Sequence, residues 1–225
     1  MKKLFYSAIL FLTCLSVFAQ SVSEGNVFYP EAAKEAQVVC GNARFTVLTP
    51  RLIRMEWAEN GIFEDKATLG IVNRNLPVPE FKVKKSSSKT IITTSDLTLE
   101  YKGTGKFDAN NLSVTFTMTD PSSKKGVRKV TWRPGMDDSA NLLGTARTLD
   151  KCDGEKTLEP YDKGTLSRDG WAIVDESDRH VFVPVDSDWK YWVEPRDDKD
   201  RQDLYIFAYG HDYMDALADF TKVAG

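Results

Sequence analysis

Short runs in which apolar and polar residues alternate occupy most of this chain and restrict the folds open to it. Ile53, Met55 and Trp57 recur at every second position. The apolar residues from Leu112 to Met118 follow the same period. A period of two places such side chains on one face of an extended strand, so each run is typical of a half-buried β-strand. Polar segments rich in Gly, Pro and Ser separate the runs, as at Ser86–Ser88, Lys102–Gly105 and Asp120–Ser123.

Many short strands of this kind predict a mainly β protein, an antiparallel β-sandwich. No clear helical run interrupts them, which disfavours a parallel α/β sheet. With 225 residues, 41% of them hydrophobic, the chain can bury a sizeable core. The other predicted strands are Arg44–Thr49, Phe81–Val83, Thr90–Thr94, Leu97–Tyr101, Val127–Trp132, Trp171–Val174, Val181–Val185, Trp189–Val193 and Leu204–Tyr209.

The apolar period changes near the C-terminus, where a helix is expected. Tyr213, Ala216, Leu217, Phe220 and Val223 recur at helical spacing and predict one apolar stripe. This stripe either packs back on the sandwich or leads into a following domain. We therefore divide the chain into a sandwich over residues 20–210 and a helical segment over residues 211–225.

The N-terminus has the features of a secretory signal peptide, residues 1–19. Met1–Lys3 is basic, Leu4–Phe18 is apolar, and Ala19 supplies a small residue before a cut. An anchor across a bilayer needs about 20 apolar residues, so cleavage is favoured over a membrane span. We expect export to the periplasm or the extracellular space, which permits a disulfide between Cys40 and Cys152 without implying one.

Charge and motifs exclude several classes of function. The net charge is −3 and no long basic run occurs, which argues against a nucleic-acid partner. No metal-binding motif, phosphate-binding glycine loop or nucleophile elbow is present, so we expect no metal and no cofactor. His180 and His211 raise the alternative of an aldose mutarotase, but no motif places a carboxylate to act with them.

The stretch Asn141–Asp169 is long and only weakly periodic. Long irregular loops in compact domains are usually functional or disordered. This loop carries Arg147, Asp150 and Asp153 close together, which makes it the candidate functional segment.

Several segments, in order, resemble the N-terminal domain of glycoside hydrolase family 31. Asn141–Asp150 reads Asn-Leu-Leu-Gly-Thr-Ala-Arg-Thr-Leu-Asp and is similar to the Leu-Gly signature near the end of that domain. Gly164–Asp175 looks like the strand that follows it, and Asp203–Phe220 looks like the junction to the catalytic barrel. Arg44–Trp57 fits the family's first strand pair, so the resemblance covers most of the chain.

The resemblance implies a β-sandwich of the galactose-mutarotase-like type, followed by a barrel that holds two catalytic aspartates. Such enzymes retain configuration through a covalent glycosyl intermediate. No barrel pattern is present here, so no catalytic residue is assigned and the chain alone is expected to be inactive. The implied role is a substrate-gating and structural domain of a retaining α-glycosidase that acts on α-glucosides or α-xylosides. A stand-alone carbohydrate-binding module is the alternative.

In that family a loop of the N-terminal domain reaches over the barrel mouth and helps to shape the sugar subsites. The matching stretch here is Arg147–Trp171. Carboxylates accept hydrogen bonds from sugar hydroxyls, and an aromatic ring can lie against a sugar's apolar face. Arg147 can instead pin the loop through a carboxylate. The residues expected to contact an α-linked oligosaccharide are Asp150, Asp153, Asp169, Trp171 and Arg147.

Each candidate also has an ordinary structural alternative. Asp150 and Asp153 are typical turn residues that bond to their own backbone. Arg168 and Asp169 can form a surface ion pair, worth about 0–1 kcal/mol. Trp171 begins a predicted strand, so core packing is favoured over sugar contact.

An aromatic cluster at Trp189, Tyr191 and Trp192 is a further candidate sugar platform. Alternation along a strand would put Trp189 and Tyr191 on one face and Trp192 on the other. A position in the core or at a domain interface is therefore favoured over a platform.

Overall fold

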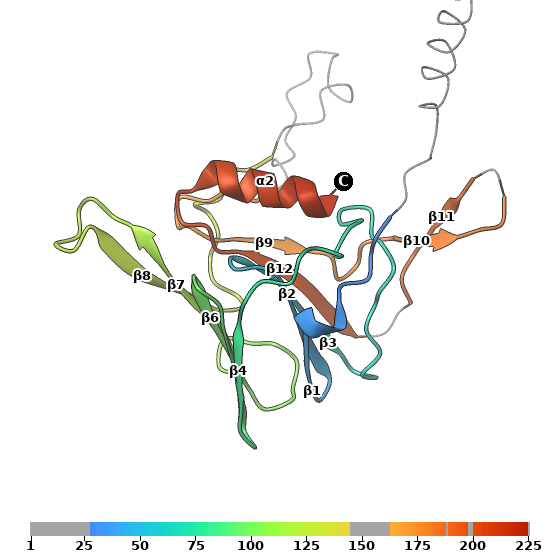
Figure 1. Ribbon diagram of the computed structural model, residues 1–225, viewed down its shortest axis with the longest axis horizontal. Helices are drawn as coiled ribbons and strands as arrows, with labels where there is room; N and C mark the ends of the chain where they lie inside the picture. The colour runs from blue at the N-terminus through green and yellow to red at the C-terminus, as the bar shows by residue number, and fades with distance from the viewer. Residues whose placement is uncertain (1–27, 145–162, 188, 198–199, 225) are drawn as a thin grey trace, which may run out of the picture.

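The computed structural model describes residues 28–144, 163–187, 189–197 and 200–224, and these form two five-stranded antiparallel sheets, a two-stranded hairpin and one C-terminal helix (Figure 1). Side chains from both five-stranded sheets share one apolar core. The predicted mainly β sandwich with a trailing helix is therefore confirmed.

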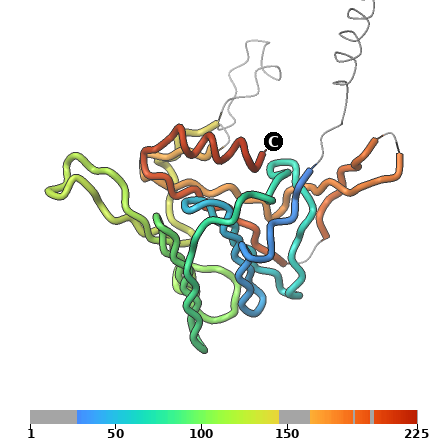
Figure 2. Tube along the Cα trace, in the orientation of Figure 1, coloured from blue at the N-terminus to red at the C-terminus, as the bar shows by residue number. Residues whose placement is uncertain are grey.

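Sheet 1 joins strands from the two ends of the chain, in the order β1-β2-β3-β12-β9. Figure 2 traces the chain through β1–β3, away into the second sheet, and back. The strand β12 lies between β3 and β9 and pairs antiparallel with both. The bounds are β1 Gln37–Cys40, β2 Ala43–Thr49, β3 Leu52–Ala58, β9 Ala172–Asp175 and β12 Arg201–Phe207, and a short 3-10 helix, η1, spans Lys34–Ala36.

Sheet 2 is a meander in which each strand pairs with the next along the chain, in the order β4-β5-β6-β7-β8. A separate hairpin, β10-β11, projects from the other side of the molecule (Figure 1). The bounds are β4 Lys82–Lys85, β5 Lys89–Thr93, β6 Leu97–Lys102, β7 Leu112–Thr119, β8 Val127–Trp132, β10 Val181–Pro184 and β11 Tyr191–Glu194.

The alternating residues of the sequence build the core between the sheets. Ile53 and Met55 on β3 are 0% exposed and face the apolar side chains of β7. Along β7 every second residue is buried, as the period of two predicted. Burial of apolar surface stabilises this packing by roughly 25 cal/mol per Å². Cys40 packs against the same core with a free thiol, and Cys152 lies outside the described residues.

The helix α2, Tyr213–Ala224, lies across the outer face of sheet 1 (Figure 1). Ala216 and Val223 are buried against Leu52 and Phe207 of the sheet. Part of the apolar stripe thus packs back on the sandwich, which is the first of the two alternatives given for it. Leu217 is 40% exposed, so the predicted stripe is only partly covered by the described residues.

Polar contacts fix α2 at both ends. Arg51 binds Asp212 at 2.8 Å and Asp215 at 2.6 Å, where the helix begins. Arg51 also lies over the ring of Tyr209, with its guanidinium carbon 4.6 Å from the ring centre. At the other end, the backbone carbonyl of Val223 accepts hydrogen bonds from the amides of residues 72 and 73. These contacts set the orientation of the helix on the sandwich.

Several details differ from the sequence-based expectation, among them the following three. Strand β1 was not predicted, because its four residues are too few to show a period. Strand β12 begins at Arg201, three residues before the predicted start, because its first residues are charged or polar. Trp189 and Trp192 are 75% and 60% exposed, so a core position is wrong for both, while the interface alternative stays a prediction.

Among the described residues there is no helix with the length and apolar character needed to cross a bilayer.

Candidate functional site

The base of the candidate loop is held by one asparagine. The side-chain amide of Asn141 donates to the carbonyl of Gly164 at 2.9 Å. Its side-chain oxygen accepts from the backbone amides of Leu143 and Gly164 at 2.8 and 3.0 Å. Asn141 is 7% exposed and joins the two chain segments that flank residues 145–162. The two described segments on either side of residues 145–162 are therefore held together at one fixed base.

A tight turn beside this base packs against the junction between β12 and α2. Gly170 and Gly210 both have a positive φ, 81° and 60°. Their backbones meet so closely that a Cβ on Gly170 would lie 2.9 Å from the Cα of Gly210. The amide of Gly210 donates to the carbonyl of Gly170 at 2.9 Å. Two of the segments that carry the family resemblance thus interlock here.

The structure brings Asp169 and Trp171 to this turn. Asp169 is partly exposed, and its backbone amide donates to the hydroxyl of Ser167 at 3.1 Å. Trp171 is 3% exposed and packs against Trp132, with ring centres 6.3 Å apart. Core packing is the alternative that the sequence favoured for Trp171. The other three candidates, Arg147, Asp150 and Asp153, lie outside the described residues.

His180 and His211 contact different parts of the molecule. A ring nitrogen of His211 lies 2.9 Å from the carbonyl of Arg168, so His211 links the α2 start to the turn. The backbone carbonyl of His180 accepts from the amide of Leu69 at 3.1 Å, next to β10. Among the described residues, no three His, Cys, Asp or Glu side chains gather in a way that could hold a metal ion.

Asn141→Ala tests the fixed loop base. The variant removes three hydrogen bonds from a buried position and leaves their backbone partners unmatched, so we expect a loss of about 1–3 kcal/mol of unfolding free energy. Urea unfolding followed by tryptophan fluorescence measures the loss. Asn110→Ala, at an exposed position, is the matched control. Equal midpoints for both variants would contradict a structural role for Asn141.

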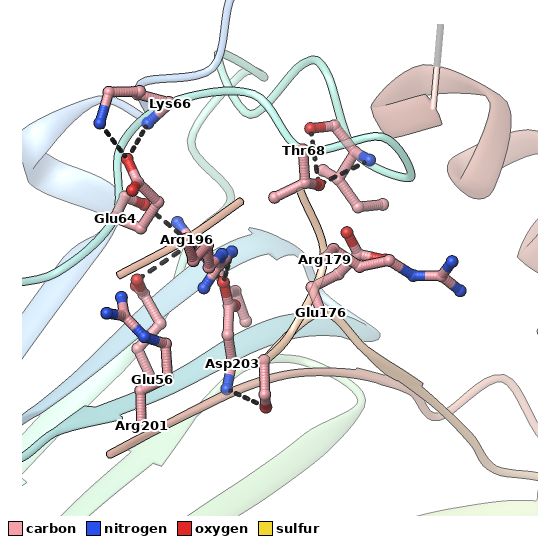
Figure 3. Close-up of polar contacts among 12 residues, drawn as sticks. Glu56, Glu64, Lys66, Thr68, Glu176, Arg179, Arg196, Arg201 and Asp203 are labelled. Atoms are coloured by element: carbon pink, nitrogen blue, oxygen red, sulfur yellow. Dashed lines mark hydrogen bonds and ion pairs between the residues drawn. The ribbon is translucent and has the colours of Figure 1, made fainter. Parts of the chain in front are cut away.

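A second polar cluster, which the sequence did not indicate, lies under a loop on the outer face of sheet 1 (Figure 3). Arg54 is 1% exposed and donates to both oxygens of Asp203, at 2.8 and 2.7 Å. Arg196 donates to Asp203 at 2.6 Å. Arg44 binds both oxygens of Glu56, at 2.7 and 3.0 Å. These five residues form the buried charge cluster.

Neighbouring charges decide which carboxylate of the cluster holds its proton more weakly. Burial acts to raise the pKa of Asp203, but Arg54 and then Arg196 outweigh it, and the pKa lies well below its usual range. Burial raises the pKa of Glu56, against the opposing effect of Arg54. Of the two carboxylates in the cluster, Asp203 therefore stays ionised to a lower pH than Glu56.

The cluster also attaches the covering loop to the sheet. Arg54 donates to the backbone carbonyl of Glu64 at 2.8 Å, and Arg44 pairs with Asp65 at 2.6 Å. Arg74 donates to the hydroxyl of Tyr205 at 2.5 Å and to the carbonyl of Lys66 at 3.0 Å. Most of these charged groups bind each other or backbone carbonyls, which indicates a structural role, although Nη2 of Arg74 and Nε of Arg196 have no hydrogen-bond partner among the described residues.

Glu176 is a further buried carboxyl beside this cluster, in the segment after β9 (Figure 3). Burial raises its pKa, and hydrogen bonding by Thr68 opposes the shift. Its partner Arg179 lies 3.5 Å away on the exposed side. The sequence does not indicate that Glu176 is buried, because an isolated Glu after a strand looks like a surface residue.

The comparisons with known proteins give a structural likeness only. No family model matches the chain, and no curated protein matches it. A solved structure of the GH31 dextranase of Flavobacterium johnsoniae with glucose has 12% identity and a TM-score of 0.45, over 89% of this chain. A mutant of that enzyme with isomaltotriose has 12% identity and a TM-score of 0.44 over the same share. The chain spans 29% of the length of both.

Proposed function

We propose that this chain is the exported N-terminal domain of a retaining α-glycosidase of glycoside hydrolase family 31, and that it shapes the sugar site without performing catalysis. The proposal rests on the sequence resemblance and on one structural observation. Two of the segments that carry the resemblance, Gly164–Asp175 and Asp203–Phe220, pack on each other through Gly170 and Gly210 at the base of the candidate loop.

The contacts at the base of the loop support this role. Asn141 closes its base, and α2 begins beside the same turn, where His211 contacts the carbonyl of Arg168. A domain that followed α2 would begin at the other end of the helix, about 18 Å along its axis from this base. Within this proposal Arg147, Asp150 and Asp153, which lie outside the described residues, contact the bound sugar. A loop on a rigid base costs less ordering free energy on binding than a free one.

Hydrolysis assays with aryl α-glucosides and α-xylosides test whether catalysis resides outside this chain. The 225-residue chain is expected to show no turnover, because no catalytic aspartate pair is assigned in it. A product that also contains the sequence encoded downstream is expected to be active. In that product, Asp150→Ala and Asp153→Ala should raise KM more than they lower kcat. Turnover by the 225-residue chain would refute the proposal.

A stand-alone carbohydrate-binding module is the second candidate, and one observation favours it. Trp189 and Trp192 on the β10-β11 hairpin are 75% and 60% exposed, and exposed aromatic rings bind the apolar faces of sugars. Titration calorimetry with soluble α-glucan oligosaccharides measures this. If the chain gives no heat of binding and the extended product is active, the binding-module candidate is excluded and the glycosidase-domain candidate remains.

A further inference from the structure

The outer face of sheet 2 contains a hollow of about 430 Å³, and its lining includes no residue of the loop base described above. A row of threonines runs across the strands here, and three of its four members, Thr93, Thr98 and Thr115, line the hollow. Thr93 of β5 pairs with Thr98 of β6, and Thr98 pairs with Thr115 of β7. Thr115 pairs in turn with Thr131 of β8, so four threonines lie side by side across four strands.

The row is long enough for more than one sugar ring. Adjacent strands lie about 4.8 Å apart, so four strands give a row about 14 Å long. The hydroxyls of Thr115 and Thr131 lie 2.9 Å apart and hydrogen bond to each other. Glu100 and Ser113, also paired across β6 and β7, extend the polar lining to one side.

The rim of the hollow is held in place by the turn between β5 and β6. The hydroxyl of Thr94 donates to the carbonyl of Pro50 at 2.6 Å. The amide of Thr94 donates to the carbonyl of Leu97 at 3.0 Å, which closes the turn. A rim fixed in this way preserves the shape of the hollow.

The charges of this face select against a charged ligand. Lys89 donates to Glu100 at 2.8 Å and, by this hydrogen bond, lowers the pKa of Glu100, so the pair remains ionised and mutually neutralised. Lys102 lies 3.5 Å from the same carboxylate. Asp96 and Lys129 lie at the rim and carry opposite charges. A phosphate-rich polymer or an anionic membrane surface would not gain from this balance.

The composition of the face also selects against an apolar partner. Its lining is dominated by hydroxyl groups, and of the described residues that line it Phe116 alone carries a ring, which is 3% exposed. Hydroxyl groups both donate and accept hydrogen bonds, so a row of them matches a ligand that does the same.

We propose that the hollow on sheet 2, with Thr98 and Thr115 at its centre, binds a neutral oligosaccharide. This site is separate from the loop of the proposed function, so each can fail without the other. Hydrogen bonds carry the binding in the absence of an exposed ring, and we expect dissociation constants on the order of 1–10 mM.

A titration of the isotope-labelled chain, followed by backbone amide signals in NMR spectra, tests this site. Isomaltotriose, maltotriose and cellotriose are the probes. At least one is expected to give saturable shifts at Thr98, Thr115 and Thr131. No saturable shift at these residues with any of the three probes overturns the proposal, as do shifts centred on Trp189 and Trp192 instead.

Two variants and one control complete the test. Thr98→Val and Thr115→Val remove a hydroxyl and keep the side-chain shape, and each is expected to weaken binding about three- to tenfold. Thr119→Val makes the same change on the same strand face, outside the hollow, and is expected to leave binding unchanged. Equal affinity in all three variants would show that the hydroxyl row does not bind the sugar.

Discussion

Asp203→Ala is expected to lower the free energy of unfolding by about 3–5 kcal/mol, because it removes the carboxylate that pairs with the buried guanidinium groups of Arg54 and Arg196. Asp203 is 1% exposed and accepts hydrogen bonds from Arg54 and Arg196. Domains of this size are stable by only about 5–15 kcal/mol, so the variant should unfold at a much lower urea concentration. Urea unfolding followed by circular dichroism measures the change.

Asp200→Ala is the matched control for this variant. Asp200 also pairs with a cation, Lys106 at 2.5 Å, but both side chains are about half exposed. Water and salt screen such a pair, so we expect a loss below about 1 kcal/mol. Similar losses for the two variants would mean that burial does not set the strength of the cluster.

The pH dependence of the Asp203→Ala effect follows from the sign of the pKa shift. The pKa of Asp203 lies below its unfolded value, which is about 3.9. Its stabilising contribution is therefore complete above about pH 4 and is lost as the pH falls toward the folded value. The difference between the original chain and the variant should be constant near neutral pH and should shrink in acid.

The sequence predicts those parts of the fold in which one face of a strand is buried and the other is not. Leu112, Val114, Phe116 and Met118 show this period, and all four face the core. The outer face of sheet 1 breaks the rule because a loop and α2 cover it. Arg54 and Asp203 therefore look like solvent-facing residues in the sequence, although both are buried.

The partner of each buried charge could not be predicted for a different reason. Arg54 and Asp203 are 149 positions apart, and only the pairing of β3 with β12 brings them together. Local periodicity carries no information on such a contact. The candidate site is similar: Asp169 and Trp171 could be placed at a turn and a strand start, but the clamp by Asn141 depends on tertiary contacts.

Gly170→Ala is the second substitution with a large expected effect. A Cβ at this position would lie 2.8 Å from the sulfur of Met118 and 2.9 Å from the Cα of Gly210. Strain at a positive φ costs about 1–2 kcal/mol and overpacking about 1–3 kcal/mol, so we expect a total loss of about 2–5 kcal/mol. Thermal and urea unfolding measure it.

Gly135→Ala separates the two contributions, because Gly135 has the same kind of backbone in open space. Its φ is 80°, against 81° for Gly170, and nothing lies within 4 Å of the added Cβ. This variant should lose only the backbone contribution of about 1–2 kcal/mol. The excess loss in Gly170→Ala then measures how firmly the turn holds the loop base against α2. If the two losses are equal, Met118 and Gly210 yield to the new methyl group and the junction is softer than its geometry indicates.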